Sequence, residues 1–203
     1  MKVLSSVDLS GAMAWRLIPT RVPSADLLAR VANPADFDLL NALDAQTNRR
    51  IQAFGHANVY VAAAFAYSLG GTPSRFNDGT WGTIYVGLEA ETALEEVRFW
   101  QARYLKGDRA PATRLDFRML SGTLEGEFLD LRGALLQAEL DPNSYSASQA
   151  FARSHRLTDR GLAYPSLRAM GGTCVVGFCP DTVRDLKHHH QVVMAWDGKD
   201  LVL

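Results

Sequence analysis

The chain has 203 residues, which suits one domain whose core is large enough to fold without a metal or disulfide. Hydrophobic residues make up 47% and charged residues 21%, as in ordinary globular proteins. Its 21 basic and 22 acidic residues give a net charge of -1, which argues against nucleic-acid binding spread over the whole surface. No apolar run is long enough to span a bilayer, and the N-terminal segment has too short an apolar part for a secretory signal, so we expect a cytoplasmic protein.

The N-terminal part predicts one strand followed by a helical segment. Residues Ala12–Ile18 favour a short strand that carries Arg16 among apolar neighbours. Arg16 is interpreted either as a side chain that reaches solvent or as a ligand-binding cation. An Asn-Pro pair at positions 33 and 34 is typical of a helix start, and it predicts a helix from there to about Phe54, within an N-terminal helical segment expected over about residues 24–55.

The next stretch predicts one short element of undecided type, followed by a loop, a strand and a helix. Residues Val59–Tyr67 favour either a strand or a short helix, since periodicity does not separate the two. A turn-rich loop follows and carries Arg75. The β-branched and aromatic run Thr83–Val86, which contains Tyr85, predicts a short strand, and a helix is expected from near Thr92 to near Gly107.

This helix has an apolar stripe and two carboxylates that differ in their position relative to it. At about 100° per residue, one face is formed by Ala93, Val97, Trp100 and Tyr104. Glu95 lies almost opposite this stripe, within reach of Arg98. Glu96 falls at the stripe's edge, where a carboxylate costs stability unless it is paired or used. Glu96 is therefore either the partner of an arginine across the core or a functional group.

The second half of the chain predicts mostly strands. Residues 114–122 and 123–133 alternate around Ser121 and Gly122, which favours a hairpin of antiparallel strands. A helix is expected to start within residues 141–148 and to end near Leu157. Further strands are expected in the last part of the chain, around Thr173–Phe178, Gln191–Trp196 and Val202.

The segment Gly161–Gly172 predicts a short strand followed by a glycine-ended loop with Ser166. Ser166 has no G-x-S-x-G setting, which argues against a nucleophile-elbow hydrolase and leaves a turn residue or a ligand contact. Cys174 and Cys179 are expected as free thiols of a reducing compartment. Two cysteines lack two further metal ligands, and the nearby run 188–190 of histidines favours a solvated stretch, so we expect no metal site.

Several short motifs, taken in order, resemble the RES domain, a family named for its arginine, glutamate and serine. They are WR at 15–16, SRFNDG at 74–79, Tyr85, ETALEE at 91–96, and GLAYPSLRAMGG at 161–172 with the Cys/Val/Phe strand after it. The likeness extends to the C-terminal WDG, although SRFND stands where many members have GGRWN. It implies a single RES domain over residues 1–203. It also implies an α+β, ADP-ribosyltransferase-like fold with a central, mostly antiparallel split sheet flanked by helices.

The resemblance also assigns site residues. The family's arginine, tyrosine, glutamate and serine fall on Arg75, Tyr85, Glu96 and Ser166, and its earlier arginine falls on Arg16. The first four would be catalytic, and Arg16, Arg75, Tyr85 and Ser166 would bind NAD. The resemblance implies no metal, because none of these roles requires one. It also implies no cofactor, because NAD is itself the substrate.

The function that the resemblance implies is NAD degradation by cleavage of the nicotinamide–ribose bond, as an NAD glycohydrolase or NAD phosphorylase. Such an enzyme would be the toxin of a type II toxin–antitoxin pair, with an Xre-type antitoxin as partner. Two alternatives are a protein mono-ADP-ribosyltransferase and a non-catalytic partner module of an Xre-type regulator. We expect no direct contact with nucleic acid or membrane. The sequence leaves open which group accepts the ADP-ribose and whether the protein is toxic. It also leaves open the identity of the antitoxin and the choice between a homo-oligomer and a toxin–antitoxin hetero-oligomer.

Overall fold

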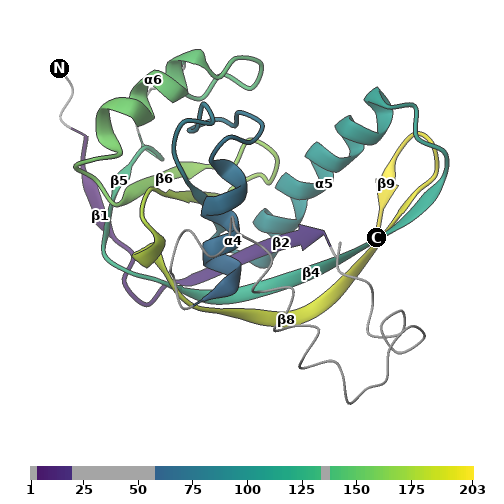
Figure 1. Cartoon of the computed structure of the whole chain (residues 1–203), viewed down its shortest axis with the longest axis horizontal. Coiled ribbons are helices and arrows are strands. Elements are labelled where there is room, and N and C mark those ends of the chain that lie inside the picture. The colour runs from purple at the N-terminus through teal and green to yellow at the C-terminus, as the bar shows by residue number, and fades with distance from the viewer. Residues whose placement is uncertain (1–3, 20–57, 134–137) are drawn as a thin grey trace.

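A computed structural model describes residues 4–19, 58–133 and 138–203 of the chain. The predicted helical segment at about residues 24–55 lies outside the described residues. The described part combines three α-helices with one nine-stranded sheet. Figure 1 shows the long strands β4 and β8 running side by side, with the helices packed around the sheet. The predicted α+β class and mostly antiparallel sheet are confirmed.

The sheet joins strands from both ends of the chain. Its strands are β1 (Ser6–Asp8), β2 (Met13–Pro19), β3 (Ile84–Gly87), β4 (Thr113–Leu124), β5 (Glu127–Asp130), β6 (Gly161–Pro165), β7 (Thr173–Gly177), β8 (Val183–Trp196) and β9 (Leu201–Val202). Their order is β1-β5-β6-β7-β3-β2-β4-β8-β9. Among the described strands, only β5 and β6 pair in parallel.

The helices are α4 (Val59–Ser68), α5 (Ala90–Gly107) and α6 (Ser146–His155), with the 3-10 turn η2 at Pro180–Thr182. The alternative left open for Val59–Tyr67 is resolved in favour of a helix. The side chain of Asn58 accepts hydrogen bonds from the backbone N–H groups of Tyr60 and Val61, which caps the first turn of α4. Among the described helices, none is both long and apolar enough to cross a membrane.

The centre of the sheet has a weak point between β2 and β3, which we call the seam. Within the described residues these strands pair at one position, where Trp15 faces Gly87. On either side of the seam, β2 pairs with β4 over seven residues and β3 pairs with β7 over four. The sheet is therefore continuous, but its two halves are joined at one point.

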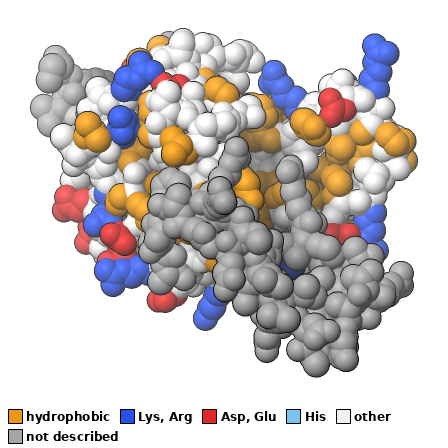
Figure 2. Space-filling model, viewed as in Figure 1, with side chains coloured by type: hydrophobic (Ala, Val, Ile, Leu, Met, Phe, Trp, Pro, Cys, Tyr) orange, Lys and Arg blue, Asp and Glu red, His pale blue; other side chains and the backbone are white. Residues whose placement is uncertain are grey.

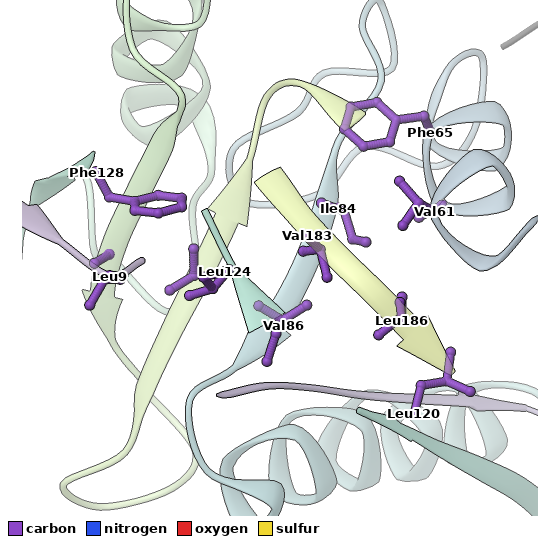
Figure 3. Packing of buried hydrophobic residues seen from close by; sticks show 14 residues of the cluster. Leu9, Val61, Phe65, Ile84, Val86, Leu120, Leu124, Phe128, Val183 and Leu186 are labelled. Carbon is purple, nitrogen blue, oxygen red and sulfur yellow. The ribbon is translucent and has the colours of Figure 1, made fainter. Parts of the chain in front are cut away.

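The core consists of hydrophobic clusters on both sides of the sheet. Figure 3 shows the cluster in which Val61 and Phe65 of α4 pack against Ile84 of β3 and Leu186 of β8. A second cluster lies under α5 and includes the fully buried Trp196. Truncating one such large side chain typically costs about 2–5 kcal/mol. These clusters fix the sheet and α5 against each other and so hold the residues of the site in place.

The predicted hairpin at Ser121 and Gly122 is wrong. Strand β4 runs unbroken from Thr113 to Leu124, and a bulge between Ser121 and Thr123 shifts its register against β8. A Cβ on Gly122 would lie 2.6 Å from the carbonyl oxygen of Arg184. The glycine therefore permits the close approach of β8, and it makes no turn.

The remaining predicted elements of the second half are confirmed with adjusted ends. The helix predicted after residue 141 is α6, and the strands predicted around 173–178 and near Val202 are β7 and β9. The strand predicted at 191–196 begins earlier, at Val183, and the histidines at 188–190 are exposed on it.

Cys174 and Cys179 carry free thiols. Within the described ranges, no group of three or more His, Cys, Asp or Glu side chains is arranged to hold a metal ion.

Candidate active site

A cavity of about 780 Å³ lies beside the seam. Its wall is built from β2, the loop before β3, β3 itself, one face of α5, the segment before α6 and the loop after β6. The charged residues that line it are four arginines and two acids: Arg16, Arg75, Arg103, Arg168, Glu96 and Asp108. Its volume is typical of sites that hold small molecules and cofactors. The excess of cations favours an anionic ligand.

Glu96 of α5 presents its carboxylate at this cavity. Its Oε1 atom accepts a hydrogen bond from Oγ of Ser166 at 2.7 Å and a longer one from Sγ of Cys174 at 3.6 Å. Within the described residues Oε2 accepts no hydrogen bond, and Glu96 forms no salt bridge. Glu95 instead pairs with Arg98 at 2.6 Å, as its position on the helix predicts. The structure therefore gives no support to a salt bridge of Glu96 across the core.

Ser166 lies directly behind Glu96, in the loop after β6. Its Oγ accepts hydrogen bonds from the backbone N–H groups of Arg168 at 3.1 Å and Ala169 at 2.9 Å. The hydroxyl proton is then directed to Glu96, so its one donor and two acceptor positions are all used. Ser166 is also absent from the residues that line the cavity. In this geometry Ser166 orients Glu96, and the direct contact with the ligand that the resemblance implies for Ser166 stays a prediction.

Cys174 of β7 contacts the same carboxylate oxygen and was not predicted as part of the site. Its side chain is buried, and burial together with the charge of Glu96 raises the pKa of the thiol well above its usual range. The thiol therefore stays protonated at neutral pH and donates a weak hydrogen bond to Glu96. Its location at the start of a buried strand gives no signal of this role in the sequence.

Tyr85 of β3 holds the loop that carries Arg75. Its hydroxyl accepts a hydrogen bond from the backbone N–H of Phe76 at 2.9 Å and shares another with Oγ of Ser74 at 2.9 Å. Burial raises the pKa of Tyr85 to about 12, so the phenol stays neutral. The two residues that flank Arg75 are thus tied to one phenol. Tyr85 also lines the cavity, while its hydroxyl is engaged by the loop.

Two residues around α6, Tyr145 and Gln149, complete the support for Arg75, and neither was predicted. The guanidinium of Arg75 lies 4.8 Å from the centroid of the Tyr145 ring, and its Nη1 donates to the carbonyl oxygen of Asp141 at 2.8 Å. Nε2 of Gln149 donates to the carbonyl oxygens of Ser74 at 2.9 Å and Asn77 at 3.3 Å. These contacts join segments some seventy residues apart, for which the local sequence holds no signal.

Arg16 of β2 spans the seam. Its Nη1 donates to the carbonyl oxygen of Tyr85 at 2.7 Å. Desolvation lowers the pKa of Arg16 to about 10, so the side chain remains cationic at neutral pH. Among the described residues, neither Arg16 nor Arg75 forms a salt bridge with a carboxylate. The same cavity is thus lined by two arginines that have no carboxylate partner among these residues.

The five residues predicted for the site therefore come together. Arg16, Arg75, Tyr85 and Glu96 line the cavity, and Ser166 lies behind Glu96. The apolar stripe of α5 has a different role from the one expected, because Val97, Trp100 and Tyr104 line the cavity as well. Only the part of the stripe near Ala93 is buried.

The fold and the site define an α+β protein whose sheet opens beside an arginine-lined cavity with one oriented carboxylate. The model of the RES domain matches residues 47–197, and the chain belongs to the RES domain family. A search of curated proteins finds no match. The crystal structure of the M. tuberculosis MbcT-MbcA toxin-antitoxin complex contains a similar chain, with a TM-score of 0.50 and 14% identity. The match covers 92% of this chain and 86% of that chain, and at this identity it shows the fold alone.

Proposed function

We propose that this protein degrades NAD by cleaving the bond between nicotinamide and ribose, with an ADP-ribosyltransferase-like fold. The observation that carries the proposal is the Glu96 carboxylate, held at Oε1 by Ser166, on the same cavity as Arg16 and Arg75. This arrangement offers a negative charge for a developing cation and positive charges for a diphosphate. NAD carries in one molecule both a diphosphate and a ribose carbon that becomes cationic when the bond to nicotinamide breaks.

The carboxylate suits the chemistry of this bond. When the C–N bond to the ribose breaks, both of its electrons stay on the nitrogen, so the nicotinamide leaves as a neutral molecule. The ribose carbon becomes an oxocarbenium-like cation, which a fixed carboxylate stabilises. Glu96 can meet this carbon through Oε2, which is left free by the described side chains. An oxygen of water or inorganic phosphate then bonds to the carbon and loses its proton, giving ADP-ribose or its phosphate.

The arginines suit the diphosphate. A guanidinium presents several N–H donors in one plane and matches phosphate oxygens in pairs. Arg75 keeps its direction through Tyr145 and Asp141, and Arg16 through the carbonyl oxygen of Tyr85. Holding the diphosphate at two points fixes the ribose against Glu96, which lowers the entropic part of the barrier.

The biological role that we propose is that of a toxin in a toxin–antitoxin pair. The chain belongs to the RES domain family, and its structural neighbour comes from a toxin-antitoxin complex. By depleting NAD, the free enzyme would stop growth, and an Xre-type antitoxin would be its neutralising partner.

Incubation of the purified protein with NAD, with and without inorganic phosphate, tests the activity. We expect free nicotinamide, with ADP-ribose or ADP-ribose phosphate as the second product. Labelled NAD that becomes attached to a protein band would show transfer to a side chain instead. A correctly folded protein that releases no nicotinamide under any of these conditions would overturn the proposal and favour a non-catalytic binding module.

A further inference from the structure

One wall of the cavity carries a continuous row of two aromatic rings with an arginine at each end. The guanidinium of Arg75 lies 4.8 Å from the Tyr145 ring centroid, and the Tyr145 and Trp100 rings lie 6.1 Å apart, edge to face. The guanidinium of Arg103 then lies 5.5 Å from the Trp100 ring centroid. We call these four residues the outer row. The outer row runs from Arg75, the arginine proposed for the diphosphate, to Arg103 on α5. All four residues line the cavity.

Two large aromatic side chains of α5 remain open to solvent along this wall. Trp100 is 39% exposed and Tyr104 is 67% exposed. Figure 2 shows hydrophobic side chains at the surface on the face that carries α5, beside Lys and Arg side chains. A tryptophan and a tyrosine on a cavity wall, next to arginines, form a surface on which a flat ring can stack.

Helix α5 places these rings at defined steps from the proposed reacting position. At 1.5 Å per residue, Trp100 lies about 6 Å and Tyr104 about 12 Å along the helix axis from Glu96. Both rings follow Glu96 on the side of the helix that lines the cavity. A ligand whose sugar contacts Glu96 and whose phosphates contact Arg75 therefore extends along α5 toward them.

We infer that Trp100 and Tyr104, with Tyr145 and Arg103, form a subsite for a nucleobase, which makes the cavity selective for dinucleotides over mononucleotides. This inference rests on the proposed function and goes beyond it, because the base takes no part in the bond that breaks. In NAD, the two phosphates and a second ribose separate the reacting carbon from the adenine. The adenine half of the molecule therefore lies along the outer row.

The selectivity is measured by comparing NAD with nicotinamide mononucleotide, which has the same reacting bond and no second base. Loss of base stacking costs about 5- to 150-fold in affinity on alanine substitution. We expect Trp100→Ala to lower the ratio of kcat/KM for NAD to kcat/KM for the mononucleotide within this range. Tyr104→Ala, whose exposed side chain can be removed without disturbing the core, acts in the same direction. The matched control is Tyr67→Ala, an exposed aromatic residue of α4 outside the cavity, which keeps the wild-type ratio.

A binding measurement separates failure of the subsite from failure of the proposed function. Calorimetric titration with AMP, which has no bond to cleave, should show binding that Trp100→Ala weakens at least fivefold. AMP binding of this kind in a protein that leaves NAD intact would support the subsite while refuting NAD cleavage. NAD cleavage in which both alanine variants leave the ratio at the wild-type value would overturn the subsite. Absence of AMP binding to the wild-type protein would overturn it as well.

Discussion

The Ser166 hydroxyl lies 2.7 Å from Oε1 of Glu96 and joins two residues that are seventy positions apart in the chain. Two backbone N–H groups occupy the acceptor positions of the same hydroxyl, so the direction of its proton is fixed. The carboxylate on the cavity is consequently oriented before any ligand binds. This preorganisation is the property that electrostatic catalysis requires.

Replacing Glu96 with glutamine should abolish most of the NAD turnover. The amide keeps the size of the side chain but removes the negative charge, and loss of one such stabilising group typically lowers kcat by about 100- to 1000-fold. Nicotinamide release by the purified variant measures this. Glu95→Gln is the matched control, since the neighbouring carboxylate pairs with Arg98. Equal losses in the two variants would contradict the role of Glu96.

Replacing Ser166 with alanine should lower kcat by about tenfold with little change in KM, because Ser166 orients Glu96 and does not line the cavity. The stability should also fall by about 1–3 kcal/mol, since the N–H groups of Arg168 and Ala169 lose their acceptor. Steady-state kinetics and urea denaturation give the two quantities. Ser166→Thr, which retains a hydroxyl, should recover much of kcat. A change confined to KM would instead indicate direct contact with the substrate.

Replacing Tyr85 with phenylalanine should release the loop of Arg75. The phenol is the partner of the Phe76 N–H and of Ser74, so its removal should raise KM for NAD about threefold to tenfold and cost about 1–2 kcal/mol of stability. Gln149→Met, which removes the donors to the same loop, should act alike. The double variant should lose less than the sum of the two, because both changes free one segment. Strict additivity would show that the two residues act on separate features.

Replacing Arg75 with alanine should weaken NAD binding by at least about tenfold, the usual cost of losing a hydrogen bond to a charged group. The free energy of unfolding should change by less than about 1 kcal/mol, because Arg75 has no carboxylate partner among the described residues. Calorimetry and denaturation measure the two effects. Arg98→Ala, which breaks the surface pair with Glu95, serves as the control for binding. A loss of several kcal/mol in stability would mark Arg75 as a structural residue.

The buried thiol of Cys174 should make the protein less stable in alkali. Its pKa is raised in the folded state, so the unfolded chain loses this proton first, above pH about 8.5. From there upward the folded state binds more protons, and the free energy of unfolding falls by up to about 1.4 kcal/mol per pH unit. Urea denaturation at pH 7.5 and 9.5 should show a smaller fall for Cys174→Ala than for wild type. Cys179→Ala is the control, and an equal fall in wild type and Cys174→Ala would refute the assignment.

Periodicity and local motifs predict much of the fold, whereas the expected site residues are assigned by the resemblance to the RES domain. The distinction between Glu95 and Glu96 follows from the geometry of one helix, and both the Arg98 pair and the contact of Glu96 with the cavity agree with it. The same periodicity groups Val97, Trp100 and Tyr104 on one face without indicating what that face meets. It meets the cavity, which Trp15 and Gly87 of the seam line as well.

The predictions that failed depend on partners distant in the chain. Gly122 suggests a turn, but the backbone of β8 passes so close to it that only a glycine fits in the unbroken strand. The supporting roles of Gln149 and Tyr145 arise because α6 packs beside a loop seventy residues earlier, and no local pattern encodes such a contact.

The hydrogen bond from Arg16 to the carbonyl oxygen of Tyr85 lies at the seam, where β2 and β3 pair at one position within the described residues. Parting two strands ordinarily leaves backbone acceptors without donors, and that penalty draws the strands together again. Here the side chain of Arg16 on β2 supplies the donor to a backbone acceptor of β3. An extended arginine side chain is longer than the spacing of about 4.8 Å between hydrogen-bonded strands. Arg16 therefore stabilises the seam itself, so the residue proposed to bind the diphosphate also satisfies a backbone group of the neighbouring strand.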